Sequence, residues 1–305
     1  MARRKPPSGR LAFPAFANRF AMAHATTTVT NLSRIAQRFA ALRQSAAMGL
    51  VAYLTAGDPT LAATEQFVLA LAEAGADVIE LGVPFSDPVA DGPVIQRASE
   101  RALRSGTTLA GVLSLVKALR AKTDVPLVLF SYFNPVLQMG LAKFGDAAKT
   151  AGADGVLITD LTPEEAGDYR AAMSSRGLDT IFLAAPTSTD ERLALIAKST
   201  SGFLYVISRT GVTGAKDQLA NELPALARRV RRFTELPIAI GFGISLPGHV
   251  SLLGGLADAA VVGSALVEEI ERAGSVDAAA AALAARVKLL KGAAVTGMSR
   301  REPQA

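Results

Sequence analysis

Three carboxylates lie on one short stretch of the chain and could do acid–base chemistry. Glu80 is part of an apolar run expected to form a strand (77–82), and Asp87 and Asp91 follow in a loop that contains three prolines. Proline fixes the φ angle, so we expect this loop to be stiff. A carboxyl group held where a strand leaves the core loses water, which raises its pKa toward the range of a general acid or base. The stretch therefore predicts a carboxylate-based site centred on Glu80.

The composition also limits which residue types could carry out catalysis or bind a metal. The chain has no cysteine, and its two histidines, His24 and His249, have no partner at metal-ligand spacing. Disulfides, a cysteine nucleophile and thiolate metal sites are therefore excluded, and we expect no metal. No uncharged apolar run reaches the roughly 18 residues of a membrane-spanning helix. Acid–base work must use Asp, Glu, Tyr or Lys.

The positive charge is concentrated at the amino-terminal end. The formal net charge is +5, and residues 1–57 hold eight Arg or Lys and no Asp or Glu. We expect residues 1–30, which show no periodic pattern, to be a flexible extension. They could be a transit peptide for plastid import or a stretch upstream of a start at Met22. We otherwise expect a cytoplasmic protein. A nucleic-acid binder is disfavoured because no groove-binding motif is present.

Short apolar strands alternate with amphipathic helices from Gly49 onward. This alternation predicts βαβ units and a parallel sheet. We expect an amino-terminal helix capped by Asn31 or Ser33. The eight expected strands cover residues 50–55, 77–82, 126–131, 154–159, 179–184, 202–207, 237–240 and 258–262. Expected helices include 61–74, 109–122, 163–176, 189–199, 219–232 and 264–273.

Eight such units over about 250 residues are the size of a (β/α)₈ TIM barrel. We assign the barrel to residues 31–292 and a flexible tail to residues 293–305. A doubly wound sheet is the alternative, but its glycine fingerprint is missing. Four of the strands follow a glycine-to-aspartate turn that ends at Asp77, Asp154, Asp179 or Asp258. We interpret the glycines as helix C-caps and the repeat as structural.

In this fold the active site lies at the carboxyl ends of the strands. Polar residues at those ends are Tyr53, Thr55, Asp58, Glu80, Tyr132, Asn134, Asp160 and Tyr205. The glycine-punctuated stretch 208–215 is a candidate lid. Glycine-rich turns follow the last two strands, at 241–243 and at 263–264, where backbone N–H groups and a helix amino terminus can bind phosphate.

Several of these segments resemble one family, the tryptophan synthase alpha chain. The resemblance covers roughly residues 31–292 and rests on the stretch 80–93 with Gln96, and on the segments 55–59, 132–134, 208–214 and 241–245. The long segment around Glu80 is specific, whereas the glycine turns alone are not. The family implies cleavage of indole-3-glycerol phosphate to indole and glyceraldehyde 3-phosphate, with no cofactor. It also implies a pyridoxal-phosphate beta chain as partner in an alpha2-beta2 tetramer.

The resemblance also implies roles for individual residues. Glu80 would move a proton between indole C3 and the side-chain hydroxyl, and Asp91 would stay ionised and accept the indole N–H. Tyr205 is a weaker candidate for hydrogen bonding near Glu80. Asp87 and Thr213 resemble the pair that couples the two loops. The phosphate site would comprise Gly214, Gly243, Gly263 and Ser264, and the indole pocket would comprise Tyr53, Ile95, Leu129 and Leu157.

Three other functions remain alternatives. Another phosphate-binding barrel, such as a sugar-phosphate isomerase, would lack the acid pair of Glu80 and Asp91. A stand-alone lyase that releases free indole would share every residue named above, and only activity without a beta chain separates it. A non-catalytic regulatory subunit is disfavoured because both acids are intact.

Overall fold

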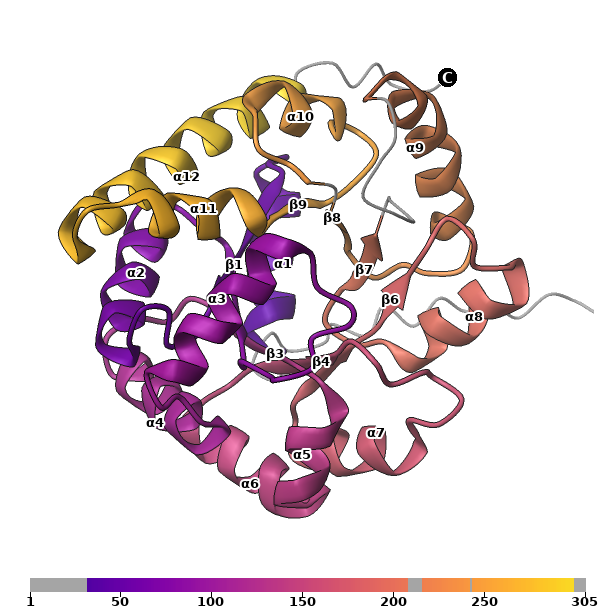
Figure 1. Ribbon diagram of the computed structural model, residues 1–305. Helices are drawn as coiled ribbons and strands as arrows, with labels where there is room; N and C mark the ends of the chain where they lie inside the picture. Colours follow the sequence, from indigo (N-terminus) through magenta and orange to yellow (C-terminus); the bar gives the residue numbers. More distant parts are fainter. Residues whose placement is uncertain (1–31, 208–215, 242, 299–305) are drawn as a thin grey trace, which may run out of the picture. The chain divides into compact units, whose positions relative to one another are not determined.

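Strands and helices alternate around a parallel barrel in this computed structural model, which describes residues 32–207, 216–241 and 243–298 (Figure 1). All the paired strands run parallel, in the order β5-β4-β3-β2-β1-β9-β8-β7-β6. The predicted TIM barrel is confirmed. The strands are β1 (Gly49–Thr55), β2 (Val78–Gly82), β3 (Leu127–Ser131), β4 (Gly155–Ile158), β5 (Asp179–Ile181), β6 (Leu183–Ala184), β7 (Leu204–Ile207), β8 (Ile238–Gly241) and β9 (Ala259–Val262).

Within the described residues, nine strands replace the eight predicted because the predicted strand 179–184 is interrupted at Phe182. Its first half, β5, pairs with β4, and its second half, β6, pairs with β7. Strands in a barrel are staggered, so the two halves of one strand can pair with different neighbours. The Phe182 carbonyl still accepts a hydrogen bond from Tyr205 N at 3.3 Å, which continues the pairing onto β7.

Helices surround these strands (Figure 1). They are α1 (Arg34–Gln44), α2 (Leu61–Glu73), α3 (Pro93–Arg104), α4 (Leu109–Arg120), α5 (Phe133–Met139), α6 (Leu141–Ala151), α7 (Gly167–Ser174), α8 (Asp190–Ser199), α9 (Lys216–Arg231), α10 (Pro247–Leu252), α11 (Ser264–Arg272) and α12 (Val276–Met298). In the view of Figure 1, α1 lies over the centre of the barrel. The sequence prediction did not name α3, α5, α6, α10 or α12. Helix α12 continues to Met298, so the stretch predicted as a tail from residue 293 begins as helix, consistent with its alanine content. The extension 1–30 lies outside the described residues.

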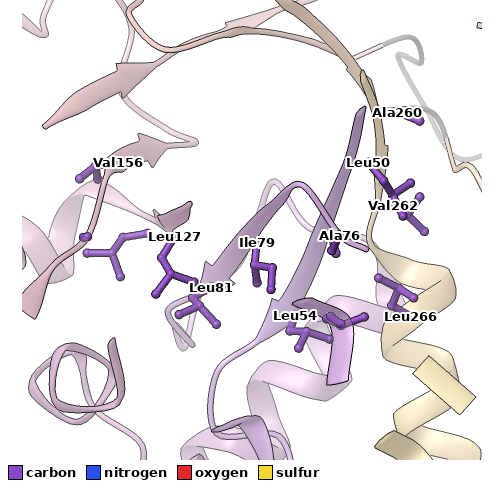
Figure 2. Close-up of a cluster of buried hydrophobic side chains, with 14 of the residues drawn as sticks. Leu50, Leu54, Ala76, Ile79, Leu81, Leu127, Val156, Ala260, Val262 and Leu266 are labelled. Carbon is purple, nitrogen blue, oxygen red and sulfur yellow. The ribbon is translucent and has the colours of Figure 1, made fainter. Parts of the chain in front are cut away.

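Two buried layers follow from the alternation of side chains along each strand. Residues such as Leu54 and Ile79 face the surrounding helices, and Figure 2 shows part of this outer layer together with Leu266 of α11. Residues such as Val51 and Phe203 face the barrel interior. There they pack with Ile35, Phe39 and Leu42 of α1. Helix α1 therefore closes the amino end of the barrel, and its predicted N-cap at Ser33 is confirmed by a hydrogen bond from Ala36 N.

The aspartates of the glycine-to-aspartate turns anchor that same end. Asp77 is 1% exposed and accepts hydrogen bonds from Leu50 N at 2.6 Å, from Arg38 Nε at 2.9 Å and from Lys291 Nζ at 2.6 Å. Asp154 accepts from Leu127 N at 2.9 Å in the same way. Each of these carboxylates therefore joins the start of a neighbouring strand to basic side chains of the helices, as expected for a structural repeat.

Substitution of Asp77 should show how much these anchors contribute. Asp77→Ala leaves the buried Leu50 N–H and the partly exposed Arg38 and Lys291 charges without their carboxylate, so we expect the free energy of unfolding to fall by about 2–3 kcal/mol. Urea denaturation measures this change. The control is Asp124→Ala, whose side chain is 97% exposed in a 3.9 Å pair with Arg34; it should change stability by no more than about 0.5 kcal/mol. Equal effects of the two substitutions would contradict the anchoring role.

No helix within the described residues is long and apolar enough to cross a membrane.

Candidate active site

A cavity of about 370 Å³ opens at the carboxyl ends of the strands, where the fold predicts it. Its wall combines inward-facing strand residues with the loops that follow β2, β8 and β9. The lining residues are Tyr53, Glu80, Ala90, Asp91, Gly92, Ile95, Phe130, Tyr205, Ile207, Gly241, Gly243, Ile244, Val261, Gly263 and Ser264. Glu80 and Asp91 thus face one cavity, as the sequence predicted.

Glu80 is completely buried, yet its carboxyl group has no hydrogen-bond partner among the described residues. It lies on β2 opposite Tyr53 of β1, which fixes its direction into the barrel. Burial alone raises the pKa of the Glu80 carboxyl to about 8. Glu80 is therefore protonated at neutral pH and can donate its proton to a ligand in the cavity.

Asp91 is placed by contacts that the sequence did not reveal. The Tyr132 hydroxyl, just after β3, accepts a hydrogen bond from Ala90 N at 2.9 Å and lies beside the Asp91 carboxyl group. Gln96 donates to the Asp91 carbonyl oxygen at 2.9 Å. Burial raises the pKa of Asp91 to about 6, and the hydrogen bond from Tyr132 acts in the opposite direction. At neutral pH Asp91 is therefore mainly ionised while Glu80 carries a proton.

Two tyrosines complete the polar wall, and the hydroxyl end of each packs against a glycine on a neighbouring strand. A Cβ atom on Gly82 would be 2.1 Å from the Tyr53 hydroxyl, and one on Gly241 would be 2.5 Å from the Tyr205 hydroxyl. Glycine at these strand ends therefore makes room for the phenol rings. The pKa of Tyr205 is raised by burial and then by the nearby charge of Glu80. The structure contains no hydrogen bond between Tyr205 and Glu80, because neither Glu80 oxygen has a described partner.

Gly82→Ala should disturb this wall. The new methyl group would displace the buried Tyr53 ring, so we expect the free energy of unfolding to fall by roughly 1–3 kcal/mol. Denaturant unfolding gives the number. In the control Gly248→Ala, the added Cβ meets no atom within 4 Å, and an alanine in a helix should raise stability by up to about 1 kcal/mol. A stable Gly82→Ala variant would show that Tyr53 can move freely.

The predicted phosphate site divides into described and undescribed parts. Gly243, Gly263 and Ser264 line the cavity, and Gly263 is the N-cap of helix α11. Gly243 has a φ of 55°, which favours glycine. Gly214 lies outside the described residues, as does the candidate lid 208–215. The described lining contains no Lys or Arg, so a phosphate group there would rely on backbone N–H groups and the positive end of α11.

The residues predicted for the indole wall lie in different parts of the structure. Tyr53 and Ile95 line the cavity, whereas Leu129 belongs to the outer layer that faces the helices. That assignment was wrong because side chains alternate along β3, and the inward-facing residue is Phe130. Phe130 packs edge-on against Tyr53, with ring centroids 5.1 Å apart. Leu157 is inside the barrel, packed with residues such as Val128, and is not part of the cavity wall.

Other polar residues at the strand ends have structural partners. The buried Asp58 is paired with Arg101 through two bonds, at 2.8 and 2.7 Å. Asp160 accepts from Phe133 N at 2.7 Å and so holds the start of α5. Asp87 is exposed and accepts from Ser86 Oγ at 2.6 Å. Its predicted partner Thr213 lies outside the described residues.

No group of three or more His, Cys, Asp or Glu side chains that could hold a metal ion occurs in the part of the chain that the structure describes. The cavity instead brings together one protonated carboxyl group, one carboxylate and an apolar wall beside a helix amino terminus. This arrangement suits proton transfer to and from an organic anion of moderate size.

Comparison with known proteins identifies the family. The family model described as tryptophan synthase alpha chain matches residues 39–295. The tryptophan synthase alpha chain of Solibacter usitatus (strain Ellin6076) is 54% identical over 241 residues, which cover 79% of this chain and 90% of that protein. A structure of Mycobacterium tuberculosis tryptophan synthase matches with a TM-score of 0.79 and 37% identity, over 86% of this chain and 98% of that chain. The tryptophan synthase complex from Pyrococcus furiosus matches with a TM-score of 0.72 and 41% identity, over 80% and 98% of the two chains. The chain therefore belongs to the tryptophan synthase alpha chain family.

Proposed function

We propose that this chain is a tryptophan synthase alpha subunit, a lyase that cleaves indole-3-glycerol phosphate to indole and glyceraldehyde 3-phosphate. Family membership supports the activity. The observation that carries the mechanism is the buried, unpartnered Glu80 carboxyl group facing the same cavity as Asp91. A sugar-phosphate isomerase has no comparable support.

The reaction needs one proton delivered and one removed. Glu80 donates its proton to indole C3, which breaks the aromaticity of the five-membered ring. The resulting carboxylate then takes the proton of the hydroxyl group on the adjacent side-chain carbon. The carbon–carbon bond breaks, its electron pair restores the indole ring, and the hydroxyl carbon becomes an aldehyde. Glu80 ends protonated, as it began, so one residue serves as acid and then as base.

Asp91 supports this step electrostatically. Protonation at C3 places positive charge on the ring nitrogen, and a carboxylate that accepts the indole N–H stabilises that charge. The hydrogen bond from Tyr132 lowers the pKa of Asp91 and so favours its ionised form. The phosphate group would occupy the other end of the cavity, at Gly243, Gly263 and Ser264.

The assay is direct. Purified protein is incubated with indole-3-glycerol phosphate, and glyceraldehyde 3-phosphate is followed through a coupled NAD-dependent dehydrogenase, with and without a beta chain. We expect slow cleavage by the chain alone and a marked acceleration when the beta chain is added. Fast release of free indole without any response to a beta chain would favour the stand-alone lyase. No cleavage in either condition would exclude the proposed activity.

The rate should depend on pH through the two carboxyl groups. Asp91 must be ionised, so kcat/KM should be lost as the pH falls through about 6. Glu80 must start protonated, so kcat/KM should be lost as the pH rises through about 8. Together they give a bell-shaped profile with its maximum near pH 7. A flat profile between about pH 5 and about pH 9 would contradict these protonation states.

A beta chain is the partner that this family membership implies, and a tryptophan synthase complex is among the matching structures. Exposed apolar side chains lie near the open end of the barrel, in the β2 loop (Val89, 85% exposed) and on α5 (Leu137, 52% exposed). The family resemblance implies that the beta chain contacts the loops after β2 and β3, where these two side chains lie. An alpha2-beta2 tetramer is the proposed assembly. Co-purification followed by mass measurement in solution tests it.

We also propose a cytoplasmic location. A chain without cysteine forms no disulfides and is compatible with a cytosol-like compartment. The basic extension 1–30 makes plastid import the alternative. Fractionation of cells that express the tagged full chain distinguishes the two locations.

A further inference from the structure

Arg286 on α12 joins two segments that are distant in sequence. Its Nη1 donates to the carbonyl oxygen of Ser245 at 3.1 Å. Its Nε donates to Oε1 of Glu269 at 3.1 Å, and its Nη2 donates to the same oxygen. The side chains of Arg286 and Glu269 are only 25% and 20% exposed. Helix α12 packs against both α10 and α11, which brings the guanidinium group to this junction (Figure 1).

The two segments that Arg286 joins carry the described residues of the proposed phosphate site. Ser245 follows Gly243 and Ile244 in the loop after β8, and both of these residues line the cavity. Glu269 lies on α11, whose first turn begins with Gly263 and Ser264 at the cavity. Arg286 itself is not part of the cavity wall. It therefore supports the two segments of the phosphate site from outside the cavity, where it would not touch the ligand.

This bridge matters because the described wall offers a phosphate no basic side chain. Backbone N–H groups bind an anion well only when they converge on it, and their positions depend on the segments that carry them. A Cβ atom added to Gly243 would meet no atom of the described residues within 4 Å, so the space at that position is open. The loop is held instead at Ile244, which is 2% exposed, and at Ser245, through Arg286. The planar guanidinium group can bind a carbonyl and a carboxylate in one fixed geometry.

We propose that Arg286 is a positioning residue for phosphate affinity. It fixes the spacing between the loop after β8 and the first turn of α11, and so sets how tightly the phosphate group of the substrate is held. This inference rests on the proposed function, which supplies the phosphorylated substrate.

The test compares Arg286→Met with Arg272→Met. Arg272 lies on α11 and, among the described residues, pairs only with Glu268 of the same helix, at 2.8 Å, so its substitution removes a more exposed ion pair of α11 without touching the loop. For Arg286→Met we expect the KM for indole-3-glycerol phosphate to rise about 5- to 20-fold, with kcat within about 2-fold of wild type. Arg272→Met should leave both constants unchanged.

Two fragment-binding measurements separate positioning from a general structural defect. The affinity for glycerol 3-phosphate should fall by the same factor as the KM rises, whereas the affinity for indole should stay at the wild-type value. An unchanged affinity for glycerol 3-phosphate would overturn the proposal. A parallel loss of indole affinity would also overturn it, because it would indicate a general loss of structure.

Two further variants keep the test decisive. Arg286→Lys can still donate to one partner and should give an intermediate loss. If Arg286→Met does not fold, Glu269→Met removes the other half of the bridge and should weaken glycerol 3-phosphate binding about 2- to 10-fold; wild-type binding in that variant would overturn the proposal. Wild-type protein that binds glycerol 3-phosphate without cleaving indole-3-glycerol phosphate would refute the proposed function alone, since the binding comparison would still test Arg286.

Discussion

Glu80→Gln is expected to lower kcat for cleavage of indole-3-glycerol phosphate by about 10³-fold, because the amide can neither donate nor accept the transferred proton. The amide has nearly the shape of the neutral carboxyl group that occupies the cavity at pH 7. An indole-bearing phosphate ester that lacks the reacting hydroxyl should therefore bind with unchanged affinity. Steady-state kinetics and isothermal titration give the two quantities.

The same variant should be more stable than the wild type at alkaline pH. Burial raises the pKa of Glu80 from 4.5 to about 8, so between these values the unfolded chain releases a proton that the folded protein keeps. The free energy of unfolding of the wild type therefore falls as the pH rises through this window, and glutamine avoids the loss. We expect a gain of roughly 2–4 kcal/mol at about pH 8 and none at about pH 4.5.

The control for both measurements is Glu100→Gln on α3, whose carboxylate is 62% exposed in a pair with Arg104. It should change neither the rate nor the pH dependence of stability. A Glu80→Gln enzyme with more than about a tenth of the wild-type kcat would show that another group carries the proton.

Asp91→Asn should lower kcat by about 10²-fold while KM stays within about 3-fold of wild type. Asparagine can still accept the indole N–H, but it carries no negative charge to stabilise the protonated ring. The acidic limb of the pH profile near pH 6 should disappear, because Asp91 is the group that titrates there. The alkaline limb from Glu80 should remain.

Tyr132→Phe should have a smaller effect on the acidic limb than Asp91→Asn and so serves as a comparison. It removes the hydrogen bond that lowers the pKa of Asp91, so the acidic limb should move to higher pH while the charge is kept. An Asp91→Asn enzyme with normal kcat and an intact acidic limb would remove Asp91 from the mechanism.

The prediction from the sequence succeeded where a feature depends only on neighbouring residues and on the direction in which a strand runs. The apolar run that ends at Gly82 predicted both a strand and the carboxyl end at which Glu80 would face the cavity. The amino-terminal cap at Ser33 and the structural role of Asp77 were also local properties. The family resemblance added the expected partnership of Glu80 with Asp91, and the shared cavity agrees with it.

The errors arose where the outcome depends on distant contacts. Leu129 was assigned to the pocket without the alternation that points Phe130 inward instead. The predicted strand 179–184 is divided because its halves pair with different neighbours. Tyr132 meets Asp91 across two loops, and Arg286 meets Ser245 across 41 positions. Neither pairing has a signal in the spacing of the chain.

The aspartates that open the strands have a consequence for how this molecule can change. Asp77 and Asp154 hold the amino ends of the strands, whereas Glu80, Asp91 and Ser264 line the cavity at the carboxyl ends. Mutations in the loops at the carboxyl ends therefore leave the aspartate contacts at the amino ends intact. A library that randomises the loops at the carboxyl ends should keep most of its members folded. Laboratory evolution toward new substrates can therefore begin in these loops.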